Sequence, residues 1–165
     1  VPAHSQAEER GEAVTIPINE INGNDPINYL DGTFFDDIIR GGDGNDYLNG
    51  AKGDDALFGG NGRDRIIMGQ GDDVATGGAG ADTFIFKSDD AAGGNDLITD
   101  FDVTEDHLNF TALNLGADTA ETQDWFDGNV TRADGQATVQ LGDSILVLTL
   151  DDQIQDEDLF AAMMF

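Results

Sequence analysis

Aspartate recurs at every ninth residue through the middle of the chain, and this spacing is the feature that could do chemistry. A glycine stands two residues before the second and each later aspartate, and an apolar residue stands two residues after all of them. Carboxylates and glycine carbonyls are hard oxygen donors, which suit Ca²⁺ better than zinc or copper. The pattern therefore indicates a series of cation sites. The aspartates are Asp37, Asp46, Asp55, Asp64, Asp73 and Asp82.

These aspartates belong to a repeat of nine residues. Read from Gly32, the units are GTFFDDIIR, GGDGNDYLN, GAKGDDALF, GGNGRDRII, MGQGDDVAT and GGAGADTFI, preceded by a weaker copy, GNDPINYLD, at 23–31. The first six residues of a unit turn the chain, because glycine adopts backbone angles that are closed to other residues. The last three, with an aliphatic centre, form a short strand that points one side chain inward.

Two units complete one coil, so equivalent positions should recur every eighteen residues. We expect Asp37, Asp55 and Asp73 to stack along one edge, and the other three aspartates along the opposite edge. Stacked parallel strands lie ~4.8 Å apart, and a Ca²⁺ ion with oxygens at ~2.3–2.6 Å on either side spans about the same gap. Pairing each loop with the next on its own edge gives roughly four ions.

One inward apolar residue in nine makes a thin core, and stacked carboxylates repel one another. Low hydrophobicity with high charge predicts disorder in the absence of metal. If each of ~4 sites sees calcium at ten times its dissociation constant, binding adds ~1.4 kcal/mol per site and ~6 kcal/mol in total. That is about the whole stability of a small domain. The sequence thus predicts a structural role for calcium.

Composition excludes several classes of function. The 165 residues carry 7 basic and 34 acidic side chains, for a formal net charge of -27, which argues against nucleic acid and anionic membranes as partners. No apolar run approaches the ~18 residues of a membrane span. HExxH, GxSxG and P-loop motifs are missing from the sequence, and His4 and His107 are far apart, so we expect no catalytic centre.

Two other interpretations of the repeat fail. A flexible Gly/Asp linker has no reason to keep an apolar residue in register. An EF-hand loop that began at Asp43 would need glycine where Leu48 stands.

The pattern GGxGxDxUx resembles the RTX nonapeptide of secreted bacterial proteins, over residues 32–85 and more loosely over 23–31. The resemblance implies an all-β fold, a right-handed parallel β-roll, in which loop positions one to four supply carbonyls and the sixth-position aspartate its carboxylate. Phe35, Ala51 and Met68 replace glycines of the pattern, so their units should hold metal less well. The implied ligands are Asp37; Gly41, Gly42, Asp43, Gly44, Asp46; Gly50, Ala51, Lys52, Gly53, Asp55; Gly59, Gly60, Asn61, Gly62, Asp64; Met68, Gly69, Gln70, Gly71, Asp73; Gly77, Gly78, Ala79, Gly80 and Asp82.

The segment after the repeats resembles the cap that closes RTX rolls in serralysin-like secreted proteases. It carries a DxIxDF-like core, in which Asp96 and Asp100 would complete one terminal metal site or else be solvated strand residues. Residues 117–127 are expected to form a short acidic helix or turn, with Trp125 and Phe126 packing the cap rather than binding sugar. Residues 137–150 predict a β-hairpin with its turn at 142–144.

The chain ends in DDQIQDEDLFAAMMF, acids followed by an apolar run. This end resembles the uncleaved signal of type I secretion substrates; the alternative is an ordinary amphipathic terminal helix. We therefore divide the chain into a flexible N-terminal segment with one strand (1–22), the calcium-binding roll (23–86), a small β-rich capping region (87–150) and a terminal secretion segment (151–165).

The function that the sequence favours is that of a non-enzymatic, extracellular calcium-binding β-roll that folds after type I secretion. Two alternatives remain open. The chain could be the C-terminal RTX module of a larger secreted protease, lipase or polysaccharide-modifying enzyme, or it could be a calcium-dependent adhesin that binds an extracellular polysaccharide. The expected partners are calcium ions, the type I secretion machinery and such a polysaccharide, and other hard cations would fit the same oxygen sites.

Overall fold

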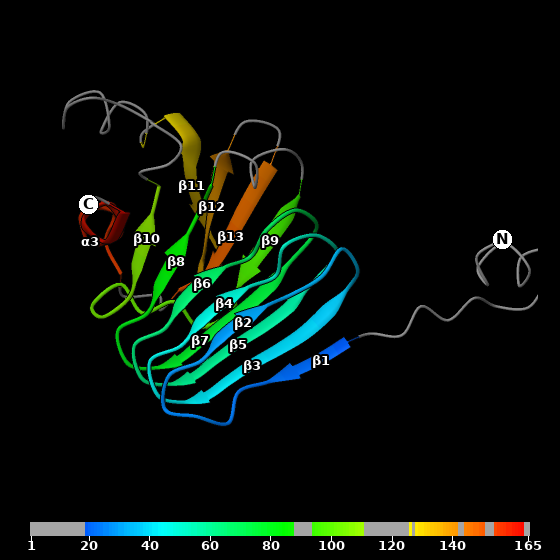
Figure 1. Cartoon of the computed structure of the whole chain (residues 1–165). Helices are drawn as coiled ribbons and strands as arrows, with labels where there is room; N and C mark the ends of the chain where they lie inside the picture. The colour runs from blue at the N-terminus through cyan, green and yellow to red at the C-terminus, as the bar shows by residue number, and fades with distance from the viewer. Residues whose placement is uncertain are drawn as a thin grey trace, which may run out of the picture.

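The chain winds into stacked parallel coils, with one strand of each coil in each of two sheets (Figure 1). The computed structural model describes residues 19–87, 94–110, 126, 128–141, 144–150 and 154–163. One sheet has eight strands in the order β1 (Asn19–Asn22), β3 (Asp37–Asp43), β5 (Ala56–Asn61), β7 (Val74–Ala79), β9 (Asn95–Ile98), β13 (Ser144–Thr149), β12 (Gln136–Leu141) and β11 (Val130–Ala133). The other has five, β10 (His107–Asn109), β8 (Thr83–Ile85), β6 (Arg65–Ile67), β4 (Tyr47–Asn49) and β2 (Tyr29–Asp31).

The register of the strands confirms the eighteen-residue coil. Ile39 lies beside Leu57, and Leu57 beside Ala75, in the eight-stranded sheet. Leu48, Ile66 and Phe84 follow one another in the same way in the five-stranded sheet. All six of these inward side chains are fully buried. The single apolar residue of each unit thus forms the core between the two sheets, as the repeat predicts.

The predicted hairpin is present, but it joins the roll rather than forming a separate layer. Strands β12 and β13 pair antiparallel, and β13 pairs parallel with β9, so the hairpin continues the eight-stranded sheet beyond the repeats. Without the hairpin, the outer backbone N–H and C=O groups of β9 would be unpaired at the edge of the sheet. Strand β13 pairs with them. Residues 142 and 143 of the expected turn lie outside the described residues.

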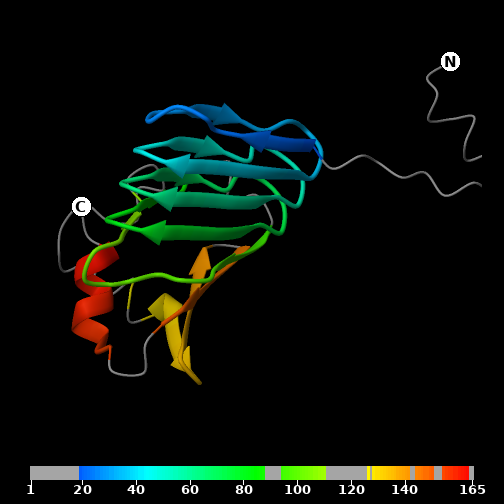
Figure 2. The same cartoon turned by 90° about the horizontal axis from the view of Figure 1, so that it is seen from below.

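The C-terminal helix α3 (Asp156–Met163) packs against β10 at the end of the five-stranded sheet (Figure 2). Leu159 is fully buried there. The ring of Phe126 meets that of Phe160 edge-on at 5.3 Å between centroids, so Phe126 packs in the core as predicted. Trp125 and most of 117–127 lie outside the described residues.

The roll begins earlier than the repeat suggests. β1 pairs parallel with β3, with Asn19 beside Asp37, so residues 19–22 already form part of the first coil. Among the described residues, no helix has the length and apolar character needed to cross a bilayer.

Candidate metal centre

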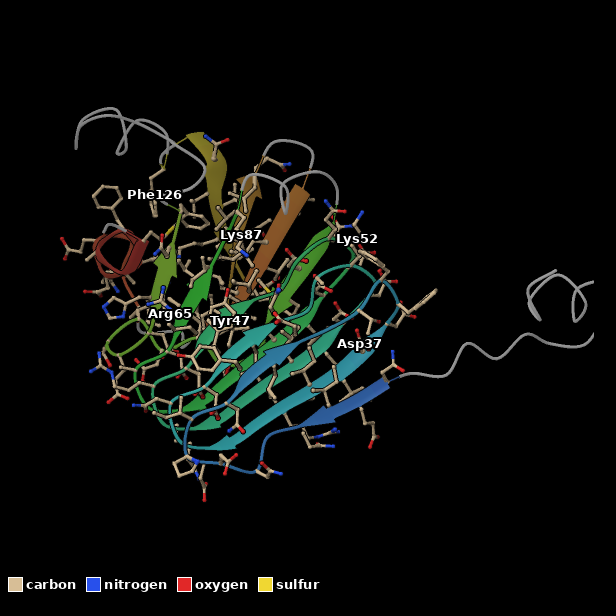
Figure 3. All side chains as sticks on the ribbon, viewed as in Figure 1. Asp37, Tyr47, Lys52, Arg65, Lys87 and Phe126 are labelled. Carbon is tan, nitrogen blue, oxygen red and sulfur yellow. The ribbon has the colours of Figure 1, made fainter. Side chains whose placement is uncertain are left out.

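The repeated aspartates form two buried columns, one at each edge of the roll. In the Asp37 column, the backbone N–H of Asp37 donates to Oδ1 of Asp55 at 2.8 Å, and that of Asp55 donates to Oδ1 of Asp73 at 2.7 Å. In the Asp46 column, Asp46 donates to Asp64 at 2.7 Å and Asp64 to Asp82 at 2.8 Å. The two predicted columns are therefore confirmed, with each carboxylate held by the backbone of the preceding coil (Figure 3 labels Asp37, the first member of its column).

These backbone bonds use only part of each carboxylate. Among the described residues, buried oxygens with no hydrogen-bond partner occur in both columns: Oδ1 of Asp37 and Oδ2 of Asp46, Asp55, Asp64 and Asp82. We call these atoms the unpaired carboxylate oxygens. A buried ionised oxygen without a partner is costly, so such a group either takes up a proton or pairs with a cation.

Three of the unpaired carboxylate oxygens, Oδ2 of Asp46, Asp55 and Asp64, lie where a backbone carbonyl also comes close. A Cβ added to Gly41 would lie 2.5 Å from the carbonyl oxygen of Gly59 and 2.6 Å from Oδ2 of Asp46. A Cβ added to Gly59 would lie 2.5 Å from both the carbonyl oxygen of Gly77 and Oδ2 of Asp64. The absent side chain thus lets a carboxylate of one loop and a carbonyl of the next coil approach the same glycine closely. Calcium accepts this mixture of ligands, so the residues fit the ion.

Backbone atoms must complete any such site. Within the described part of the chain, no three acidic or histidine side chains lie close enough together to hold a metal by themselves. Calcium takes six to eight oxygens. The rest of the ligand set must therefore come from carbonyls of the glycine-rich loops, or from water.

The loop positions predicted as ligands fall into classes with different geometry. The second- and fourth-position residues have positive φ, which explains the glycines there; Ala51 adopts φ 77° despite its side chain. They are Gly42, Ala51, Gly60, Gly69 and Gly78, and Gly44, Gly53, Gly62, Gly71 and Gly80. The first-position residues Gly41, Gly50, Gly59 and Met68 are buried, and Gly77 is buried too.

The third-position side chains turn away from the columns. Asn61 Nδ2 donates to Asp43 Oδ1 at 2.7 Å in an exposed position, and the Lys52 ammonium lies 5.6 Å from the centroid of the Phe34 ring. Ala79 has no polar side chain to offer, and Gln70 is half-buried. The side chains of Asp43, Lys52 and Asn61 are thus engaged outside the columns, and the resemblance assigns only the carbonyls of these positions to an ion.

Burial dominates the electrostatics of the columns. Desolvation raises the pKa of Asp55 to about 7, with the neighbouring charges of Asp73 and Asp37 adding to the effect. Desolvation also raises the pKa of Asp82 to about 6 and that of Asp64 above its ordinary value. In the absence of a cation, the folded roll therefore favours protonated carboxyls at several positions of the two columns.

Asp96 and Asp100 do not share a site, contrary to the expected single terminal metal centre. Oδ1 of Asp96 accepts from the backbone of Asp73, at the edge of the Asp37 column. The carboxylate of Asp100 accepts from the backbone N–H groups of Gly77 and Gly78, at 2.9 and 2.8 Å, near the end of strand β7 at the opposite edge. Asp96 lies within strand β9 and Asp100 lies two residues beyond its end, so an extended chain at ~3.3 Å per residue carries the two side chains to different edges.

Asp106 is the column member that the sequence analysis left out of the site. Its Oδ1 accepts from the backbone of Asp82 at 2.9 Å and its Oδ2 from that of Asp102 at 3.0 Å, so it ends the Asp46 column. The signal was present: Asp106 precedes the buried Leu108 by two residues, the same spacing as in every unit. The insertions after the repeats shift it out of the nine-residue count.

A second, exposed ladder was also missed. At the fifth position of the loops, the backbone of Asp54 donates to Asp36 Oδ1 at 3.0 Å, and that of Asp72 donates to Asp54 Oδ1 at 2.9 Å. Here the carboxylate lies one coil earlier than its donor, the reverse of the buried columns. The frequent Asp or Asn at this position was the available sequence signal.

Comparison with known proteins agrees with the repeat pattern. The family model for the RTX calcium-binding nonapeptide repeat (4 copies) matches residues 22–57, 31–66 and 58–98. No curated protein matches the chain. Similar solved structures include two subunits of a mannuronan C5-epimerase of Azotobacter vinelandii. AlgE6R3 is 26% identical over 91% of this chain and 82% of that one, with a TM-score of 0.33. AlgE6R2 is 31% identical over 82% of this chain and 85% of that one, with a TM-score of 0.34.

Proposed function

The chain belongs to the RTX calcium-binding nonapeptide repeat family, and from that premise we propose that it is an extracellular β-roll whose coils order when Ca²⁺ fills the loops. The observation that carries the proposal is the set of unpaired carboxylate oxygens, which are buried and, at Asp46, Asp55 and Asp64, lie near a backbone carbonyl of the next coil. A divalent cation between successive loops converts the repulsion within each column into attraction. The part of the chain that the family model matches is a calcium-binding repeat module rather than a catalytic domain.

The number of ions follows from the columns. Each gap between aspartates of successive loops offers one place for a cation, which gives the gaps Asp37–Asp55, Asp55–Asp73, Asp46–Asp64 and Asp64–Asp82. This arrangement supports roughly four ions, the number expected from pairing each loop with the next on its own edge.

Export by type I secretion is the second element of the proposal. A roll that needs millimolar calcium stays unfolded in the calcium-poor cytosol and orders outside the cell, where the ion is abundant. The resemblance of residues 151–165 to a type I secretion signal supports this route, and α3 forms within that segment.

Circular dichroism during calcium titration of the metal-stripped chain tests the proposal. We expect a transition from disorder to β structure at ~0.1–1 mM, the range of weak extracellular calcium sites. Magnesium serves as the control, because it demands octahedral geometry at shorter distances and should not order the roll. A chain that is fully folded in chelator, or that gains no structure in calcium, would rule the proposal out.

A further inference from the structure

Asn28 occupies the first position of the Asp46 column. We call each such position, one in every coil, a rung; each later rung of this column carries aspartate. Asn28 is 8% exposed, and its backbone N–H donates to Oδ1 of Asp46 at 2.7 Å, as the aspartates do further along. Its side-chain Nδ2 donates to the same oxygen at 2.9 Å. The rung therefore has the geometry of the others but a neutral side chain.

The amide nitrogen lies where the later rungs place an unpaired carboxylate oxygen. A Cβ added to Gly23 would lie 2.8 Å from Nδ2 of Asn28, whereas one added to Gly41 or Gly59 would lie 2.6 or 2.5 Å from Oδ2 of the aspartate in its own loop. At the first rung, a hydrogen-bond donor thus replaces the acceptor that needs a cation.

Both the oxygen and the nitrogen of the Asn28 side-chain amide make hydrogen bonds. Nδ2 also donates to the carbonyl oxygen of Asp25 at 2.5 Å, and Oδ1 accepts from the backbone N–H groups of Asn24 and Asp25 at 3.1 and 3.3 Å. The side chain therefore closes its own loop and at the same time binds the next rung. A neutral amide does this at no cost in buried charge.

We propose that Asn28 closes the first rung of the Asp46 column without a cation, its N–H groups taking the place of the ion. The inference rests on the proposed calcium-binding function. The far end of the column closes in a comparable way, because both oxygens of Asp106 accept backbone N–H bonds. The ions of this column then lie only between Asp46 and Asp82, and Asn28 is a positioning residue that sets where the metal ladder starts.

The variant Asn28→Asp tests this role, because it keeps the side-chain shape and replaces only the donor. The rung then holds a carboxylate beside Oδ1 of Asp46. We expect native mass spectrometry at saturating calcium to count one more bound Ca²⁺ than in the wild type. The calcium midpoint of folding should rise about threefold to tenfold. Asn28→Ala adds no charge and should leave the ion count unchanged.

Asn49→Asp is the matched control. Asn49 Nδ2 donates to Asp31 Oδ1 at 3.0 Å in an exposed pair one coil apart, so this substitution makes the same chemical change outside the columns. It should alter neither the ion count nor the midpoint. An unchanged ion count in Asn28→Asp, with a wild type that binds calcium, overturns the inference and leaves the proposed function intact. A wild type that binds no calcium refutes the proposed function and this inference together.

A second substitution makes the test independent of how well Asn28→Asp folds. Asp64→Asn places an amide in the middle of the column, where its donor can face Oδ1 of Asp82 as Asn28 faces Asp46. We expect Asp64→Asn to bind at least one ion fewer than the wild type and to fold at a lower calcium midpoint than Asp64→Ala. Equal midpoints for the two variants would show that the amide does not replace the ion.

Discussion

The first position of each loop is where a single residue decides whether a rung can receive an ion. Its φ is not positive, so the backbone alone does not demand glycine there. Glycine is needed because a Cβ would meet the aspartate of the same loop and, in the inner loops, the carbonyl of the next coil. Met68 places a buried side chain at this position in the fifth unit. We therefore expect that loop to bind calcium less tightly than its neighbours.

Gly59→Ala tests the first position directly. The added methyl would lie 2.5 Å from Oδ2 of Asp64 and 2.5 Å from the carbonyl of Gly77, so one of these oxygens must move. We expect a loss of about 1–3 kcal/mol of stability in calcium, the usual cost of overpacking, and a higher calcium midpoint. Thermal unfolding and the calcium titration measure the two effects.

Gly128→Ala is the control for this substitution, because a Cβ at Gly128 meets nothing within 4 Å. It should leave both quantities close to the wild type. If Gly59→Ala behaved like Gly128→Ala, the convergence of carbonyl and carboxylate at this position would have no part in metal binding.

At the scale of elements, α3 covers the end of the five-stranded sheet. The sequence left two interpretations of this segment open, a secretion signal and an amphipathic helix, and the structure shows a helix whose Leu159 is fully buried. A helix that packs in the core contributes to stability. That contribution does not conflict with a role in export, because the chain is unfolded when it is exported in the proposed mechanism.

Leu159→Ala measures the contribution of the helix. Removing a fully buried leucine side chain should cost about 2–5 kcal/mol in thermal or denaturant unfolding with calcium present. The number of bound ions should stay the same, because α3 packs against β10, which lies outside the nine-residue units. Glu157→Ala, at an exposed position of the same helix, should change little. A lower ion count in Leu159→Ala would mean that the helix supports the columns.

At the scale of the whole molecule, the columns link folding to pH. Burial raises the pKa of Asp55 to about 7 and those of Asp82 and Asp106 to about 6, above the values near 3.9 expected for the unfolded chain. Between about pH 4 and 7, the folded state therefore binds more protons than the unfolded state. The stability of the calcium-free protein must fall as the pH rises through this range.

We accordingly expect the metal-stripped chain to show more β structure at pH 5 than at pH 7.5 by circular dichroism. Calcium requires ionised carboxylates, so the calcium midpoint should be higher at pH 5 than at pH 7.5. A metal-stripped chain that is less ordered at pH 5 than at pH 7.5 would contradict the assignment of buried carboxylates with raised pKa.

Much of the roll could be predicted because the repeat is a local rule applied again and again. Nine residues fix one turn and one strand, and two units fix the coil, so the columns Asp37–Asp73 and Asp46–Asp82 follow from counting. The grouping of Asp96 with Asp100 failed because counting stops where insertions begin. Only strand pairing shows that β9 sends these two residues to opposite edges.

The sequence by itself determined the coil, its register and the oxygen-rich loops, because each depends on backbone angles and side-chain alternation within a single unit. The tertiary structure alone decided which carboxylate oxygens stay without a partner, that Asp106 ends a column, and that the amide of Asn28 donates to Asp46. Those outcomes depend on hydrogen bonds between residues eighteen or more positions apart. The partner of such a bond is set by how successive coils stack, and no unit contains that information.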